Sequence, residues 1–127
     1  MKLRIKGQSV RLRLLRSEVT DLLDKGLIEE TIYLGSGDQS AFTYALAIDS
    51  GLRETEVRYE PSKMVIALPK AKAISWAETN QVGIYAVVGI ERHENLDLIV
   101  EKDLARLDLS DADNLDPFPN PELEGFR

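Results

Sequence analysis

The chain has 127 residues, with 16 Lys and Arg against 22 Asp and Glu, 43% hydrophobic residues and no cysteine. This length suits one domain with a hydrophobic core, and the lack of cysteine excludes disulfides, thiolate zinc sites, iron–sulfur clusters and cysteine nucleophiles. No apolar run approaches the roughly 20 residues of a membrane helix, the basic start lacks the apolar stretch of a secretory signal, and a net charge of −6 disfavours general nucleic-acid binding, so we expect a cytoplasmic protein without membrane or nucleic-acid partners.

The first segment of the chain is strongly basic, because residues 1–16 carry six cations and no acid. Lys and Arg alternate with aliphatic residues on both sides of Gly7-Gln8. This pattern predicts two strands joined by a type II′ turn, in which Gly7 adopts the positive φ that glycine accepts readily. Leu3 then pairs with Leu12, and Ile5 with Val10, on the buried face. The other face gathers five cations, which are Lys2, Arg4, Lys6, Arg11 and Arg13.

The predicted register opposes like charges. It places Lys2 opposite Arg13 and Arg4 opposite Arg11, and like charges directly opposite each other are destabilising. Such a face is tolerable beside an anion, beside acidic side chains of the same or a neighbouring subunit, or in water, where long side chains lie over apolar edges with their charges solvated. If acids of the same chain cover this face, the candidates are the Glu29-Glu30 pair and the acids of the C-terminal tail.

Beyond this hairpin, helix and strand signals alternate. Ser17 as N-cap and Gly26 as terminator predict a short helix. Strands are expected over residues 27–34 and 41–48, before and after a loop rich in Gly and Ser. A second hairpin follows, with its turn at Pro61-Ser62.

The second half of the chain continues the mixed pattern. Pro69 ends the second hairpin and begins a second helix, in which Trp76 is expected to anchor the core. Residues 82–88 are apolar on both faces, which predicts an interior strand covered on both sides. Residues 96–100 are its expected hairpin partner, and residues 102–107 are expected to add a short helical turn.

These elements predict an α+β fold, a curved or barrel-like antiparallel sheet of six to eight strands with two short helices covering one face or end. We expect one globular domain over residues 1–107 and an acidic, proline-containing tail over residues 108–127. The tail contains six acids and a single cation, Arg127. The tail is expected to lie against the domain or against a second subunit. The sequence does not decide whether the chain forms a homodimer. The sequence shows no repeat at the periods of solenoid proteins.

No catalytic residue and no metal site are predicted. His93, the single histidine, lies in a predicted turn beside Glu94, without a nucleophile motif to complete a triad. One histidine and no cysteine are too few ligands for a zinc site, and the acidic stretch of residues 108–116 lacks the EF-hand spacing. Neither a P-loop nor a dinucleotide-binding glycine pattern occurs, so no cofactor is expected.

The segment Glu54-Thr55-Glu56-Val57-Arg58 weakly resembles the E-x-E-x-K signature of triphosphate-tunnel enzymes, with arginine in place of lysine. Those enzymes hold a polyphosphate and its metal inside a closed barrel. The resemblance implies inward-facing cations from the basic hairpin, together with Glu29 and Glu30. It gives an alternative function, that of a metal-dependent phosphoanhydride hydrolase.

Five segments together resemble a family of small uncharacterised bacterial proteins, known only as a domain of unknown function. They are Met1–Leu14, Thr43–Leu46, Trp76–Ile84, Leu98–Leu104 and Phe118–Pro121. The resemblance implies a small bacterial domain and brings no activity, cofactor or catalytic residue. The function we expect is therefore that of a non-enzymatic binding or interaction domain, in which the five hairpin cations meet an acidic protein surface or a small anion.

Overall fold

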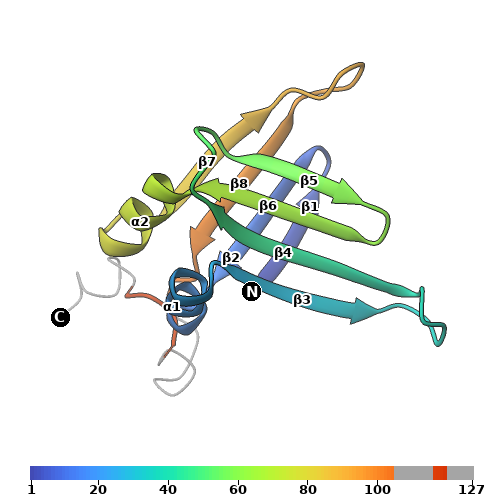
Figure 1. Ribbon diagram of the computed structural model, residues 1–127, viewed down its shortest axis with the longest axis horizontal. Coiled ribbons are helices and arrows are strands. Elements are labelled where there is room, and N and C mark those ends of the chain that lie inside the picture. The colour runs from blue at the N-terminus through green and yellow to red at the C-terminus, as the bar shows by residue number, and fades with distance from the viewer. Residues whose placement is uncertain (105–115, 120–127) are drawn as a thin grey trace.

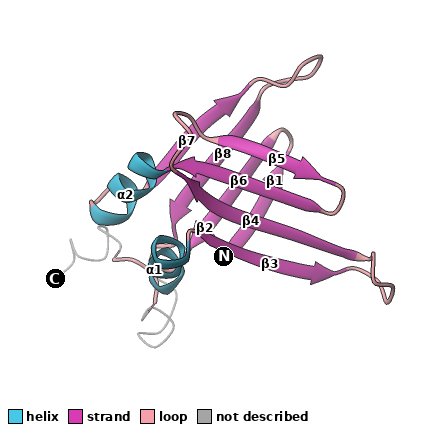
Figure 2. Ribbon diagram, in the orientation of Figure 1, coloured by secondary structure: helices cyan, strands magenta, loops and turns pink. Residues whose placement is uncertain are grey.

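The computed structural model describes residues 1–104 and 116–119, and within them the chain forms two helices and eight strands (Figures 1 and 2). The strands of the first half are β1 (Lys2–Lys6), β2 (Ser9–Leu14), β3 (Leu27–Tyr33) and β4 (Ala41–Asp49). Those of the second half are β5 (Glu56–Glu60), β6 (Lys63–Pro69), β7 (Gly83–Val88) and β8 (Leu96–Lys102). Helix α1 (Arg16–Lys25) follows β2, and helix α2 (Lys70–Glu78) follows β6.

The strands form two four-stranded sheets. Sheet A has the order β1-β2-β8-β7 and sheet B the order β3-β4-β6-β5. In each sheet the central pair is parallel and the two outer pairs are antiparallel. Figure 1 shows the sheets as two layers whose strands cross, with both helices at the same end.

The predicted α+β class and the two short helices are confirmed, but the prediction of one antiparallel sheet is wrong. The strands are divided between two mixed sheets, and among the described residues they form no closed barrel, so the barrel-like shape is not confirmed. The physical reason is the position of the helices, because α1 carries the chain from sheet A to sheet B and α2 carries it back. The parallel pairs β2–β8 and β4–β6 then join the hairpins within each sheet, in place of one continuous antiparallel meander.

The chain passes twice through the order strand, strand, helix, strand, strand. The two passes are equivalent in register as well as in order: Leu12 pairs with Val100, and Ile66 (12 + 54) pairs with Leu46 (100 − 54). The chain is thus a structural duplication, in which β1, β2, α1, β3 and β4 correspond to β5, β6, α2, β7 and β8.

The core lies between the two sheets and is closed at one end by the helices. Alternate residues of the central strands point inward, as the period of a strand requires, and the helices add Val19, Leu22, Ala73 and Trp76 to the same cluster. Trp76 is 0% exposed, and its Nε1 donates a hydrogen bond of 2.9 Å to the carbonyl oxygen of Val82. The prediction of Trp76 as a core anchor is confirmed.

Both predicted hairpins have the expected register. Leu3 pairs with Leu12 across the first turn, and Gly7 has a φ of 55°, as a type II′ turn requires. Val57 pairs with Ile66 across the second turn.

Three local predictions need correction. Ser17 is not the N-cap of α1, because the helix begins at Arg16 and its first turn is closed by the Leu15 N–H donating to the Glu18 carboxylate at 2.9 Å. The strand over residues 82–88 is not interior, because β7 is an edge strand of sheet A. The expected helical turn over residues 102–107 begins instead with the last residue of β8, and residues 105–107 lie outside the described residues.

Only residues 116–119 of the predicted tail are described, and they lie against the body. Phe118 donates its N–H to the Asp103 carbonyl at 2.8 Å, and its ring packs against the core beside Arg16 and Lys102. The Asp116 carboxylate accepts a hydrogen bond of 2.8 Å from the Ser17 hydroxyl. The boundary of the domain at residue 107 and the position of the other tail residues stay predictions.

Candidate functional site

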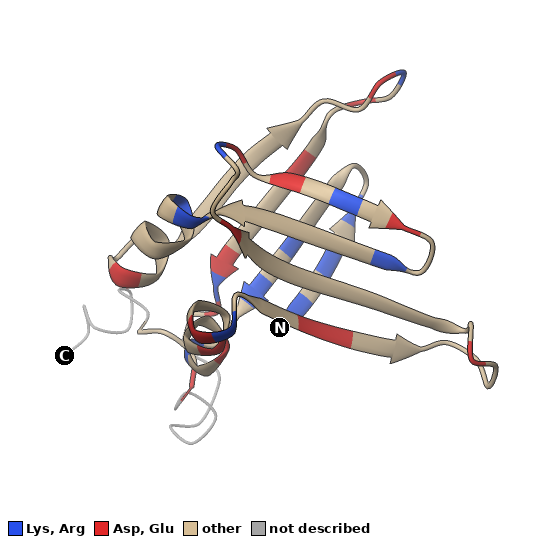
Figure 3. Ribbon diagram, viewed as in Figure 1, with Lys and Arg blue, Asp and Glu red and all other residues tan. Residues whose placement is uncertain are grey.

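The five predicted site residues lie together on the outer face of sheet A, the face turned away from the core. Figure 3 shows the blue positions of β1 and β2 side by side on this sheet. We call this surface the basic face, and it comprises the outward residues of β1, β2, β8 and β7: Lys2, Arg4, Lys6, Ser9, Arg11, Arg13, Asp97, Ile99, Glu101, Tyr85 and Val87. The cations therefore point outward, and the inward direction that the tunnel-enzyme interpretation requires is wrong.

The predicted opposition of like charges is present. Lys2 lies opposite Arg13, and Arg4 lies opposite Arg11, across the antiparallel pair β1–β2. Directly opposed side chains on neighbouring strands have their Cβ atoms about 5 Å apart, so these charges repel each other unless something neutralises them.

Two acids from the end of β8 neutralise one end of the face. Glu101 Oε1 lies 2.7 Å from Arg13 Nε and 3.5 Å from Arg11 Nε, while Asp103 Oδ2 lies 3.1 Å from Lys2 Nζ. Both carboxylates are largely buried, since their side chains are 13% and 9% exposed. The parallel pairing of β2 with β8 brings these acids to the cations, because it places Glu101 beside Arg13.

The acids named from the sequence serve elsewhere. Glu30 lies 3.3 Å from the N-terminal ammonium of Met1, and Glu29 lies 3.6 Å from Lys63 on sheet B. The prediction that Glu29 and Glu30 neutralise the hairpin is therefore wrong. The alternation Asp97, Leu98, Ile99, Val100, Glu101 is the signal that puts acids on the outer face of β8, but only the long-range pairing with β2 makes it relevant.

The other end of the face keeps an excess of positive charge. Arg4 and Lys6 are exposed and have no ion-pair partner among the described residues. Arg11 Nε is buried and makes no hydrogen bond to any described residue, because its geometry toward Glu101 is not that of a hydrogen bond. With Ser9, these three cations line a hollow of about 280 Å³. The face has five cations against Asp97 and Glu101, and with Asp103, which pairs with Lys2 at its border, the excess is two positive charges.

The duplication supplies an internal comparison on sheet B. Arg58 occupies the position equivalent to Arg4 (4 + 54), on the outer face of β5. Its guanidinium donates to Asp49 Oδ2 and Glu56 Oε1, both at 2.7 Å. These bonds raise the pKa of Arg58 and hold the pKa of Asp49 below its usual value. The same place in the fold is thus internally paired in one half and turned to solvent in the other.

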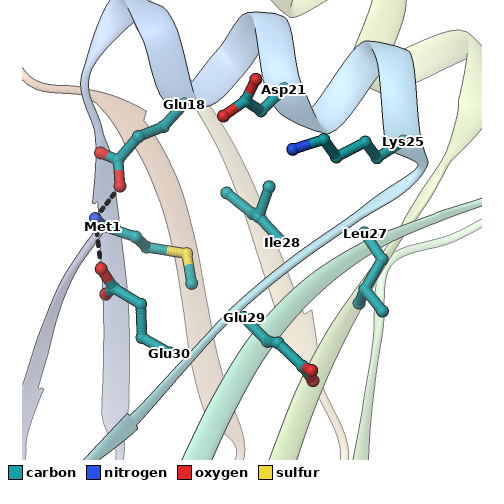
Figure 4. Close-up of a pocket in the computed structure, with 8 residues that line it drawn as sticks. All are labelled: Met1, Glu18, Asp21, Lys25, Leu27, Ile28, Glu29 and Glu30. Carbon is teal, nitrogen blue, oxygen red and sulfur yellow. Dashed lines mark hydrogen bonds and ion pairs between the residues drawn. The ribbon is translucent and has the colours of Figure 1, made fainter.

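A second hollow, of about 290 Å³, lies beside the N-terminus (Figure 4). The Met1 ammonium forms ion pairs with Glu18 and Glu30, and the Tyr44 hydroxyl donates to Glu30 at 2.7 Å and to the Met1 carbonyl at 3.1 Å. Burial, followed by the hydrogen bond to Glu30, raises the pKa of Tyr44 to about 12. The ammonium, both carboxylates and the hydroxyl of this cluster are thus paired with one another.

The residues of the alternative hydrolase are not brought together around an enclosed site. Glu56 and Arg58 pair with each other on the outer face of sheet B. Within residues 1–104 and 116–119, no group of three or more His, Asp or Glu side chains is placed to hold a metal ion. His93 lies in the exposed connection between β7 and β8.

Comparison with known proteins gives one match. Residues 1–122 match a family described as a family of unknown function (DUF7009), and this span includes all five segments that carried the resemblance. No curated protein and no solved structure matches the chain. Neither helix in the described part of the chain has the length and apolar character needed to cross a bilayer.

Proposed function

We propose that this chain, which belongs to the family of unknown function DUF7009, is a non-enzymatic interaction domain whose basic face binds an anionic partner. The observation that carries the proposal is the end of the face formed by Arg4, Lys6 and Arg11. Three cations meet there around one hollow, and Arg11 Nε has a buried donor without a hydrogen-bond partner among the described residues.

The energetics of the hairpin support a bound anion. Opposed arginines weaken a strand pair, and a buried N–H without an acceptor costs about 1–3 kcal/mol. An anion in the hollow would relieve the repulsion, because guanidinium groups bind carboxylate and phosphate oxygens through paired, charge-assisted hydrogen bonds. A shift of the Arg11 side chain toward the anion would also give its buried Nε an acceptor. Ser9 adds a hydroxyl donor to the same wall.

The partner's chemistry follows from the size and charge of the surroundings. The face has a local excess of positive charge, while the chain as a whole has a net charge of −6. A long polyanion would meet repulsion beyond the face, whereas a compact cluster of carboxylate or phosphate oxygens would not. We therefore assign the face to an acidic protein surface or a small anion, which share this chemistry.

The test is calorimetric titration of the full chain with two probes, an oligoglutamate peptide and inorganic phosphate. We expect Arg4→Gln and Arg11→Gln each to weaken binding by about tenfold, since each removes a charge-assisted hydrogen bond. Folding should be intact or improved, because each change also removes a like-charge repulsion. Binding of the peptide alone would indicate an acidic protein surface, and binding of phosphate would indicate a small anion.

Arg58→Gln is the matched control. It changes the same residue type at the equivalent position of the other half, where the guanidinium is already paired with Asp49 and Glu56. It should leave both titrations unchanged. The proposal fails if neither probe binds, or if Arg58→Gln weakens binding as much as Arg4→Gln does.

A further inference from the structure

The edge strand β7 differs from the other three sheet edges in charge. The sequence of β7, Gly83–Val88, contains no charged residue. By contrast, β1 carries three cations, β3 carries two acids, and β5 carries two acids and an arginine. Charged residues on edge strands block pairing with other chains, so β7 is the edge on which the sequence places no such block.

The backbone of β7 is oriented for pairing. The Lys102 N–H donates to the Val82 carbonyl at 2.9 Å, so in this antiparallel register Ile84 and Ala86 bond to β8. The N–H and carbonyl groups of Tyr85 and Val87 therefore face away from β8, toward the edge. At the start of the strand, the Gly83 carbonyl oxygen accepts a hydrogen bond of 3.0 Å from the Gln81 side chain, so this carbonyl is already occupied.

The side chains that accompany this edge are apolar and exposed. Tyr85 is 67% exposed and Val87 66%, both on the outer face of sheet A. At the equivalent positions in β3 (85 − 56 and 87 − 56) stand Glu29 and Thr31. The two halves of the duplication thus differ in the features that control edge pairing.

We propose that β7 pairs antiparallel with β7 of a second copy of this chain. In such a two-fold symmetric contact every strand meets itself, so a charged strand would oppose its own charges. The β1, β3 and β5 edges bring charged side chains into such a contact, whereas β7 brings none. With Ala86 at the two-fold axis, Tyr85 faces Val87 of the second copy on both sides of the axis, and aromatic side chains pair favourably with β-branched ones.

The resulting dimer has one continuous sheet of the order β1-β2-β8-β7, followed by the strands of the second copy in the reverse order, β7-β8-β2-β1. The two-fold axis is perpendicular to the sheet, so both basic faces lie on the same surface and the two cationic hairpins lie at its opposite ends. This arrangement keeps like charges apart. It would also give an anionic partner two sites to bind, which raises apparent affinity without a new contact. The dimer itself does not rest on the proposed function.

The test is sedimentation equilibrium of the full chain over a wide concentration range, at low and high salt. We expect a weak dimer, because a single strand pair buries less area than a standard interface, and we expect it to persist at high salt. The double variant Tyr85→Glu/Val87→Glu places acids opposite acids and should raise the dimer dissociation constant by about tenfold or more. Val87→Pro removes an outward N–H without touching the β7–β8 ladder and should act in the same direction.

Thr31→Glu, at the position of β3 equivalent to Val87, is the control and should leave the dimer unchanged. The inference is overturned if the chain is monomeric at every concentration, or if the β7 variants associate as the unmodified chain does. It is also overturned if Thr31→Glu disrupts the dimer equally, or if high salt abolishes it. The last result would indicate association of the basic face with acids of another copy.

Discussion

Arg11 and Arg58 differ in how fully the acids of their own chain pair with them, and this difference distinguishes the two outer faces. Arg11 shares Glu101 with Arg13, but the shorter distance, 2.7 Å, belongs to Arg13. Arg58 on sheet B has two carboxylates to itself at hydrogen-bonding distance. Arg58 is thus held by two acids through hydrogen bonds, while Arg11 shares one acid at a longer distance, lines the hollow and has no hydrogen bond at Nε to a described residue.

The Tyr44 hydroxyl gives a prediction at alkaline pH. Its pKa is raised from 10.0 in the unfolded chain to about 12 in the folded one, chiefly by burial and then by Glu30. The folded state therefore keeps this proton where the unfolded state has lost it. Its stabilising contribution is present below pH 10 and is lost as the pH rises toward about 12.

Chemical denaturation across this pH window tests the point. The unmodified chain should lose free energy of unfolding more steeply than Tyr44→Phe, which has no hydroxyl to titrate. Tyr33→Phe, which alters an exposed ring, is the control and should follow the unmodified chain. Parallel curves for the unmodified chain and Tyr44→Phe would show that the hydroxyl has no raised pKa.

At the level of elements, the local pairings follow from the sequence and the long-range ones do not. Alternation and a two-residue turn fix the register of β1 with β2 and of β5 with β6. No local pattern indicates that β2 runs parallel to β8. Glu101 and Asp103 could therefore not be predicted from the sequence as partners of the hairpin cations. Similarly, β7 is apolar on both sides, and this favours an interior position although Tyr85 and Val87 are exposed.

The β2–β8 pairing predicts two opposite effects of Glu101→Gln. The fold should lose about 2 kcal/mol, because a largely buried carboxylate that holds two guanidinium groups is removed. The basic face gains one net positive charge, so binding of oligoglutamate should become tighter. Denaturation and calorimetry on the same variant measure both effects, and weaker binding together with lower stability would show that Glu101 merely holds the structure.

At the level of the whole molecule, the duplication places two similar sheets in one chain and gives their outer faces different charges. It was not predicted from the sequence, because many equivalent core positions share only hydropathy, as Leu12 and Ile66 or Leu22 and Trp76 do. Packing requires only that these side chains be apolar and fill the core. The outer faces have no such requirement, which allows one to be paired internally and the other to hold excess cations (Figure 3).

The most direct test is an NMR titration of the full chain with oligoglutamate, followed through the backbone amides of both sheets. We expect shifts concentrated on β1, β2 and β8, largest around Ser9 and Arg11, with sheet B unaffected around Arg58. Shifts centred on sheet B, or spread equally over both outer faces, would contradict this expectation.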